Sequence, residues 1–400
     1  MARKRTQTPA TDNADPRAAI HAALHSAAVK DLGSKGVVTA DQFFDSIYGV
    51  PIVQNIPLQW LFGVDVLPME SMISVVGPPG CTKSTMVWYL GGLWMGFGGM
   101  VSFIDGELKQ NPDHIRGIIQ NDDLYRLAVL RYPVESTEEL LERVHYSAKN
   151  HLKLCPTLNI PLMILVDSLG SVGAEEGVKA MEKDGTAGSA AGFLAARNAN
   201  EITQQLRAFH PKYLAGHPFI LVFVNHQKPT MDQPASSFAP VQKSEPGGVH
   251  KDFNASFVME MSKGQSGGNK TEDWADVYIT SKKAGLTRTG KKIKTTLHTV
   301  TNVDPETGTS SFQVWYDWDE TLVFVLQDEK GPVSAADMKN VLQITGTGNN
   351  LNCKRLGLKE ASRRELGAAI HADSSMTSDV QDLLRIVRKP AYDGSQARPA

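Results

Sequence analysis

Between residues 56 and 225, short apolar runs alternate with longer amphipathic stretches. The apolar runs, which have the length of buried strands, are residues 72–76, 101–105, 127–130, 162–166 and 219–224. The stretches between them predict helices at residues 84–94, from Ser136 to about Lys149, and 191–209. Uniformly apolar strands separated by helices are typical of a parallel sheet covered on both faces. The pattern therefore predicts an α/β fold with a mainly parallel central sheet flanked by helices.

The pattern changes after Asn225. A long loop at residues 228–251 contains four prolines and the pair Gly247-Gly248. The alternating segments that follow, at residues 253–261, 277–280, 294–300 and 311–315, predict antiparallel strands that extend the sheet. Helices are expected near residues 334–342, 359–372 and 378–388.

The ends of the chain differ from this middle part. Residues 15–32 are Ala-rich with apolar positions at helical spacing, and Asp15 and Gly33 are suitable start and stop residues. We therefore expect three regions: an N-terminal tail with a helix (1–45), an α/β core (46–325) and a small C-terminal helical region (326–400).

Composition narrows the class of protein. Hydrophobic residues make up 41% and charged residues 21% of the 400-residue chain, which excludes wholesale disorder. The formal charge of −2, from 41 basic and 43 acidic side chains, argues against a globally basic DNA-coating protein. Three widely spaced cysteines suit a reducing compartment and form neither a disulfide framework nor a zinc motif. Residues 86–104 lack any charge, but Gly98-Gly99 predicts a buried helix, a turn and a strand rather than a membrane span. We expect a cytoplasmic protein with no membrane partner.

One loop has the spacing that binds nucleotide phosphates. It follows the predicted strand at 72–76 and consists of Gly77, Pro78, Pro79, Gly80, Cys81, Thr82, Lys83, Ser84 and Thr85. Backbone N–H groups of such a loop surround the β-phosphate, while Lys83 reaches the β- and γ-phosphates and Ser84 reaches Mg²⁺. Thr82 departs from the pattern, because a glycine usually precedes the lysine.

Carboxylates follow two other predicted strands. Asp167 ends one strand and is placed to hold Mg²⁺-bound water, and Asp105 and Glu107 end another, where a carboxylate can deprotonate an attacking water. Ligands of such sheets bind at the carboxyl ends of the strands. An Asn-Lys-x-Asp guanine signature is absent from the sequence, so ATP is favoured over GTP.

From about Ile56 to about Leu297, roughly three-fifths of its length, the chain resembles the RecA family of strand-exchange recombinases. The motifs that carry the resemblance are Ile56-Pro57-Leu58, Leu67-Pro68-Met69, the Gly77–Thr85 loop, Phe103-Ile104-Asp105-Gly106-Glu107, Leu165-Val166-Asp167-Ser168, Leu194-Ala195-Ala196-Arg197, Val224-Asn225-His226, Gly247-Gly248 and Phe253-Asn254-Ala255-Ser256. Thr82 and the Asn225-His226 pair are more similar to the tailed-phage members than to the bacterial ones. The resemblance implies a RecA-like P-loop NTPase core at residues 46–325. It also implies that the helix within residues 1–45 is an oligomerisation helix, which would dock on the adjacent subunit.

The resemblance also implies roles for individual residues around ATP and Mg²⁺. Glu107 would activate water, and His226 would sense the γ-phosphate and relay it to a DNA loop. Asn111 and His114 would contact adenine, and Lys282 or Lys283 would reach the ATP of a neighbouring subunit. Ser84 and Asp167 would hold the metal.

DNA contacts are implied for two loops, at about residues 173–190 and 228–251. The residues expected to contact DNA are Arg197, Lys228, Phe238, Lys243, Gly247, Gly248, Lys251 and Phe253. Asp252 stands where the family usually has a lysine beside the loop-ending phenylalanine. The lysines at 291, 292 and 294 are further candidates for phosphate contacts.

The function that this resemblance implies is ATP-dependent recombination. The protein would form a helical filament on single-stranded DNA and exchange that strand into duplex DNA, with a single-strand-binding protein and a loader as further partners. Two alternatives stay open: a hexameric RecA-fold motor (a helicase or packaging ATPase), and a non-catalytic paralogue, which Thr82 suggests.

Overall fold

The computed structural model describes residues 47–393, apart from residues 54, 109, 159, 170–217, 227, 230–242, 245–254, 270, 285–288, 308–309 and 329–330, together with Ser26, Ala27 and Lys30. The chain divides into two compact units, Met1–Ile47 and Tyr48–Ala400. In the first unit, Ser26, Ala27 and Lys30 are helical, and the rest of the predicted helix lies outside the described residues, as does the predicted helix at 191–209. The three predicted regions stay a prediction.

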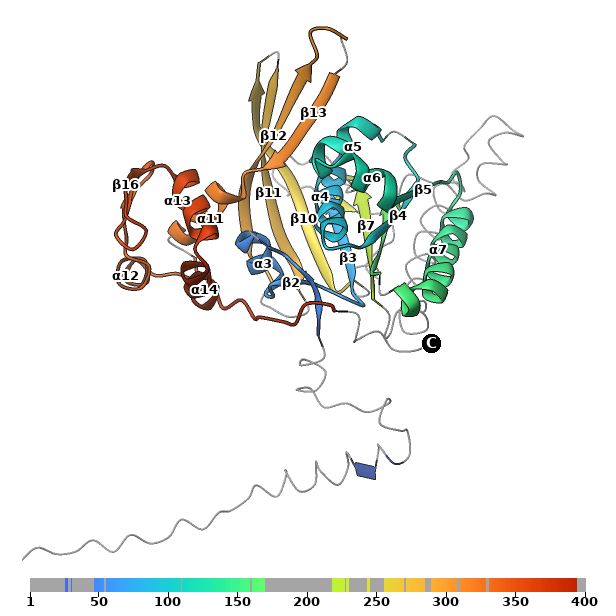
Figure 1. Ribbon diagram of the computed structural model, residues 1–400, viewed down its shortest axis with the longest axis horizontal. Helices are drawn as coiled ribbons and strands as arrows, with labels where there is room; N and C mark the ends of the chain where they lie inside the picture. Colours follow the sequence, from blue (N-terminus) through green and yellow to red (C-terminus); the bar gives the residue numbers. More distant parts are fainter. Residues whose placement is uncertain are drawn as a thin grey trace, which may run out of the picture. The chain divides into compact units, whose positions relative to one another are not determined.

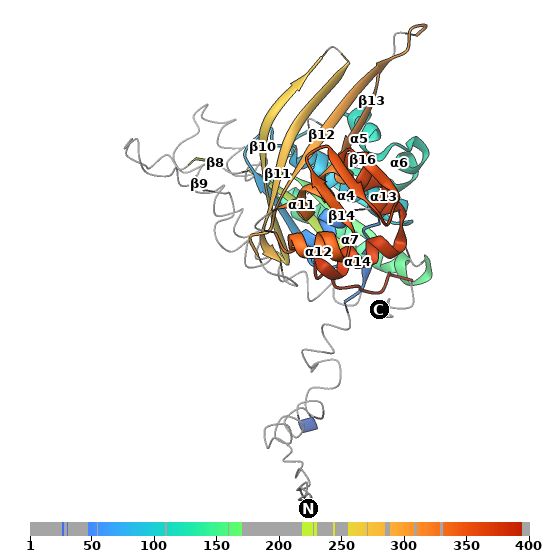
Figure 2. The ribbon, with the colours of Figure 1, turned by 90° about the vertical axis from the view of Figure 1, so that its left-hand side faces the viewer.

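Nine strands form the main sheet of the described residues, in the order β13-β12-β11-β10-β3-β7-β6-β4-β5 (Figures 1 and 2). Their bounds are β3 Met72–Gly77, β4 Met100–Asp105, β5 Val129–Pro133, β6 Leu162–Asp167, β7 Phe219–His226, β10 Phe257–Gly268, β11 Glu272–Ala284, β12 Lys292–Val303 and β13 Ser310–Tyr316. Neighbours from β10 to β5 are parallel, and β10 to β13 are antiparallel. The predicted mainly parallel sheet and its antiparallel extension are confirmed.

Alternate side chains of the parallel strands enter two separate hydrophobic cores. On β7, for example, Ile220, Val222 and Val224 belong to one core, whereas Phe219, Leu221 and Phe223 belong to the other. Helix α4 (Lys83–Gly96) covers the first face and α7 (Thr137–Leu158) covers the second (Figure 1). Burial on both faces explains why these strands are apolar at every position.

Two local predictions need correction. The run at 127–130 is not simply a strand, because α6 (Asp122–Ala128) extends into it and β5 begins at Val129. Asn121 starts α6 by accepting a hydrogen bond from the Leu124 amide at 2.8 Å. Helix α7 also continues beyond residue 149 to Leu158.

The uncharged stretch at 86–104 forms a helix, a turn and a strand, as predicted. Helix α4 ends at Gly96, Gly98 has a φ of +96° in the turn, and β4 begins at Met100. Within the described part of the chain, no helix is both long and apolar enough to cross a membrane.

The C-terminal region contains a sheet as well as helices, so the prediction of a purely helical region is wrong. Its helices are α11 Trp318–Gln327, α12 Ala335–Asn340, α13 Arg363–Ala372 and α14 Ser374–Leu383. Strands β14 Ile344–Thr347, β15 Asn350–Cys353 and β16 Leu358–Ala361 form a three-stranded antiparallel sheet among the described residues. Residues 387 and 391 then bridge back to Val64 and Gly49, beside the small sheet of β1 (Gly49–Pro51) and β2 (Val66–Pro68).

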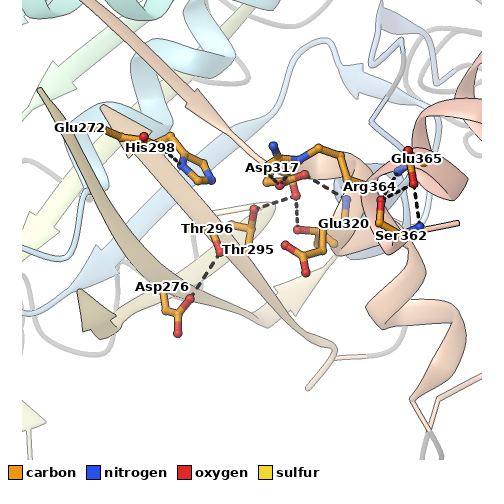
Figure 3. A network of polar contacts seen from close by, with 11 residues as sticks. Glu272, Asp276, Thr295, Thr296, His298, Asp317, Glu320, Ser362, Arg364 and Glu365 are labelled. Carbon is orange, nitrogen blue, oxygen red and sulfur yellow. Dashed lines mark hydrogen bonds and ion pairs between the residues drawn. The ribbon is translucent and has the colours of Figure 1, made fainter. Parts of the chain in front are cut away.

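A polar network joins this region to the main sheet (Figure 3). The buried Asp317 caps α11 by accepting from the Glu320 amide at 3.0 Å, and its other carboxylate oxygen accepts two bonds from the Arg364 guanidinium on α13. The Thr295 hydroxyl of β12 donates to the Asp317 carbonyl at 3.4 Å. Residues from three elements therefore meet at Asp317.

Candidate functional site

The loop that joins β3 to α4, residues Gly77–Thr82, is named here the β3–α4 loop. It requires glycine at Gly77, where a Cβ would lie 2.3 Å from the Met261 carbonyl oxygen. Gly80 has a φ of +75°, a conformation that favours glycine. Pro79 and Gly80 are exposed at the loop's surface. Thr82 is the N-cap of α4, so the loop leads directly into the amino end of a buried helix.

Lys83 is buried at the base of this loop. Its ammonium donates to the carbonyls of Gly77 at 3.0 Å and Pro78 at 2.8 Å, and burial lowers its pKa. No described residue forms an ion pair with Lys83, although Asp167 and Glu107 are near enough to oppose the pKa decrease. A buried cation without a paired carboxylate is suited to receive an anionic ligand.

Thr82 has a left-handed backbone, with φ 66° and ψ 24°. Its hydroxyl is buried without a hydrogen-bond partner in the described part of the chain, while its carbonyl accepts from the buried Tyr316 hydroxyl at 3.4 Å. Cys81 is also buried, and this burial raises the pKa of its thiol. The backbone therefore takes the conformation expected where a glycine is usual, with a β-branched residue in its place.

Asp167 ends β6 and is completely buried. Burial raises its pKa to about 6, and the nearby Ser84 hydroxyl opposes the increase. The Gln110 amide donates to one carboxylate oxygen at 2.6 Å, and the other oxygen has no hydrogen-bond partner of ordinary geometry among the described residues. Asp167 thus keeps one oxygen for a further ligand.

Glu107 lies at the centre of a polar cluster formed at three neighbouring strand ends. His226 Nε2 at the end of β7 is 2.6 Å from Glu107 Oε1, and the Ser168 hydroxyl after β6 donates to the same oxygen at 3.2 Å. The Glu107 amide in turn donates to the Asp167 carbonyl at 3.2 Å. His226 Nδ1 is buried and has no partner in the described residues.

The structure separates the roles of the two carboxylates after β4. Asp105 is fully buried and accepts from Arg131 Nε at 2.9 Å and from the Leu108 amide at 2.9 Å. Its oxygens are therefore occupied by Arg131 of β5 and by the turn that follows β4. Glu107 is about a quarter exposed, so of these two it is the carboxylate that a water molecule can reach.

Gln110 is a site residue that the sequence analysis missed. It belongs to the same turn as Glu107 and connects that turn to Asp167. A single glutamine in a loop gives no pattern, and its role depends on the pairing of β4 with β6.

The expected adenine and interface residues lie outside this cluster. Asn111 caps α5 (Pro112–Ile119) by accepting from the Asp113 amide at 2.9 Å, and the half-buried His114 packs edge-on against Phe312, with a pKa lowered by burial. On β11, Lys282 forms an ion pair of 2.9 Å with Glu260, next to the half-buried Lys283. These contacts do not show which of the two, Lys282 or Lys283, would reach the ATP of a neighbouring subunit.

Most of the predicted DNA contacts cannot be described. Arg197, Phe238, Gly247, Gly248, Lys251 and Phe253 lie outside the described residues, as does the loop at 173–190. The backbone of Lys228–Pro229 (β8) pairs antiparallel with that of Lys243–Ser244 (β9), so the two ends of the 228–244 segment lie together. This pairing begins two residues after His226.

Three lysines of the basic run, residues 282–294, contact the chain itself. Lys291 donates to the Trp60 carbonyl at 2.6 Å, Lys292 lies 4.7 Å from the centre of the Tyr278 ring, and Lys294 forms a 2.9 Å ion pair with Asp276. Contacts of these lysines with DNA phosphates would have to compete with these interactions.

ATP and Mg²⁺ fit the chemistry of these residues. No group of three or more His, Cys, Asp or Glu side chains that could hold a metal occurs within the described ranges. Mg²⁺ needs no such group, because it commonly binds one or two carboxylates together with water and phosphate oxygens. Ser84 and Asp167 could supply the protein ligands, beside the buried cation of Lys83.

No protein-family model matches the chain, and no curated protein matches it either.

Proposed function

We propose that this chain is an ATP-dependent DNA recombinase with a RecA-like P-loop core, similar to the tailed-phage members of that family. The observation that carries the proposal is the Glu107 cluster: a reachable carboxylate, held by His226 at 2.6 Å, on the strand ends beside the β3–α4 loop. The buried Lys83 and the uncommitted Asp167 oxygen support a nucleotide phosphate and its metal at the same edge.

Each residue of this site would have its own task in hydrolysis. Lys83 and the amides at the start of α4 would bind phosphate, and Ser84 and Asp167 would hold Mg²⁺, which would neutralise charge on the phosphates. Glu107 accepts the proton of the attacking water. Its hydrogen bond with His226 keeps the carboxylate in position and makes its basicity sensitive to any movement of that histidine.

His226 also gives the site a connection to DNA. It precedes the β8–β9 pair by two residues, and the segment between those strands is the expected second DNA loop. Binding of single-stranded DNA to this segment would shift His226 and change the position of Glu107. The partners of the proposed filament are single-stranded and duplex DNA, further copies of the chain, a single-strand-binding protein and a loader, in the cytoplasm of the host.

The experiment is an ATPase assay with and without single-stranded DNA, alongside binding of a fluorescent ATP analogue. Glu107→Gln should slow hydrolysis by about 10²–10⁴-fold and spare ATP binding, because only the base is lost. His226→Ala should spare ATP binding and remove the stimulation by DNA, whereas Lys83→Ala should weaken ATP binding itself. Hydrolysis at the wild-type rate in Glu107→Gln would contradict the assignment of the base.

Thr82 favours a second candidate, a non-catalytic nucleotide-binding paralogue. A β-branched residue with a left-handed backbone and a buried hydroxyl changes the loop that surrounds phosphate. The same assay separates the two candidates, since the paralogue predicts ATP binding with hydrolysis no faster than that of the Lys83→Ala variant.

A further inference from the structure

A large cavity lies between the antiparallel part of the main sheet and the C-terminal region, away from the Glu107 cluster. Its volume is about 1220 Å³, and its walls include residues of α3 (Ile56–Phe62), β11, β12, α11, α12, β14 and α13. Pockets for small molecules usually measure about 300–1,000 Å³. The cavity is therefore large enough for a short segment of a macromolecule.

The described residues that line the cavity are mostly basic where they are charged. Four cations, Lys292, Lys294, Lys339 and Arg363, face one carboxylate, Asp328. Lys294 is paired with Asp276, but no ion pair joins Lys292, Lys339 or Arg363 to a carboxylate among the described residues. Arg363 is the first residue of α13, where the helix dipole disfavours a cation and favours an anion. This excess of positive charge favours an anionic ligand.

The rings of the cavity are covered by cations, which argues against stacked nucleic-acid bases. Lys292 lies over Tyr278 at 4.7 Å, Arg363 lies over Phe324 at 4.3 Å, and the neighbouring Lys291 lies over Trp60 at 5.4 Å. Single-stranded nucleic acid binds through exposed aromatic faces together with phosphate contacts. Here each of these rings already has a cation over one face.

The remaining wall is partly apolar. Ile293, Leu326, Val333, Met338 and Ile344 form its floor and are themselves almost entirely buried, whereas Pro332 and Ala335, which also line the cavity, are exposed. The backbone of duplex DNA has no apolar group to place against such a wall. An occupant that satisfies both the cations and the wall carries carboxylates and apolar side chains together.

We propose that this cavity binds a peptide segment of a partner protein in which carboxylate and apolar side chains alternate. The apolar side chains would pack on Pro332 and Ala335, and the carboxylates would pair with Lys339, Lys292 and Arg363. This inference does not depend on the proposed recombinase function, because none of these residues belongs to the Glu107 cluster.

The test is fluorescence anisotropy of the full-length protein with short labelled peptides that alternate Asp with Leu, Phe or Ile. At least one of the three should bind, and counterparts with Asn for Asp, or with Ser for the apolar residue, should bind about tenfold more weakly. Lys339→Glu and Arg363→Gln should each weaken binding about tenfold, with thermal unfolding as the check on folding. Lys354→Glu, the same charge change in an exposed turn outside the cavity, should leave affinity unchanged.

Three results would overturn the proposal. The first is that none of the three acidic and apolar peptides binds. The second is that Lys339→Glu and Arg363→Gln bind the peptide as the wild type does. The third is that single-stranded or duplex DNA displaces the peptide at matched salt, which would make the cavity a nucleic-acid site.

Discussion

Thr82 carries two unfavourable features in a single residue of the proposed nucleotide loop. Its left-handed backbone costs an L-residue roughly 1–2 kcal/mol, and its buried hydroxyl lacks a partner in the described residues. Both costs fall on the loop that is proposed to surround phosphate.

Replacing Thr82 should therefore stabilise the protein. Thr82→Gly is expected to raise the free energy of unfolding by about 1 kcal/mol, after the entropy cost of glycine is subtracted. Urea denaturation measures this change. Thr82→Ala is the matched control, because it removes the hydroxyl but keeps the strain, and it should gain less. A less stable Thr82→Gly variant would show that the left-handed backbone is not strained.

At the scale of single residues, the sequence predicted the site residues that follow the ends of strands. It did not predict those whose role depends on a contact with a residue far away in the chain. Glu107, Asp167 and His226 each end an apolar run, and parallel pairing brings them to one edge of the sheet. Gln110 and the Asp105–Arg131 pair were missed because their partners lie 57 and 26 residues away in the chain. Such contacts have no local pattern.

At the scale of secondary-structure elements, the packing of α11 and α13 beside β12 depends on one ion pair. Arg364 reaches the buried Asp317 carboxylate, which also caps α11 (Figure 3). Removing one partner of such a pair leaves a buried charge without compensation, although Arg364 itself is more than half exposed.

We expect Arg364→Ala to lower the free energy of unfolding by about 1–3 kcal/mol, measured by urea denaturation. Arg388→Ala is the control, because Arg388 and Asp382 are both exposed and such pairs contribute about 0–1 kcal/mol. An equal loss of unfolding free energy in the two variants would show that the Arg364–Asp317 ion pair contributes no more than an exposed pair.

Lys291 gives a pH-dependent prediction for the basic run. Burial lowers its pKa from 10.5 to about 8, so the unfolded chain binds more protons than the folded protein between these pH values. Its destabilising contribution is therefore fully present below pH 8 and disappears as pH rises toward 10.5.

Lys291→Met keeps an unbranched side chain of similar size beside Trp60, and removes the charge together with the hydrogen bond to the Trp60 carbonyl. Its free energy of unfolding at pH 7 should exceed that of the wild type by about 1–2 kcal/mol, a value reduced for partial solvent exposure. The difference should shrink between pH 8 and pH 10. Denaturation of both proteins across this range measures it, and a difference that does not change with pH would contradict the assignment to Lys291.

Strands could be predicted from the sequence where both of their faces are buried, or where apolar and polar residues alternate strongly. Strands β3, β4, β6 and β7 match their predicted apolar runs to within two residues. The sheet of β14–β16 was missed because its strands have four residues each and Gly346 and Gly348 interrupt the pattern. Helix α11 was missed because its apolar residues follow β13 after a single residue, Asp317.

The whole molecule has a formal charge of −2, so attraction by overall charge cannot drive it to DNA. Several lysines of the basic run contact the chain's own rings, carboxylates and carbonyls. Binding of DNA would then depend on the two proposed loops and on assembly of many copies along one strand, with ATP holding neighbouring copies in the binding state.

Electron microscopy of the full-length protein with single-stranded DNA and a non-hydrolysable ATP analogue tests this central claim most directly. The recombinase account predicts helical filaments that form with the analogue, and that are lost without nucleotide or in the Lys83→Ala variant. Closed rings around the DNA would support a hexameric motor instead. Filaments that form equally well without nucleotide would contradict the proposed role of the β3–α4 loop.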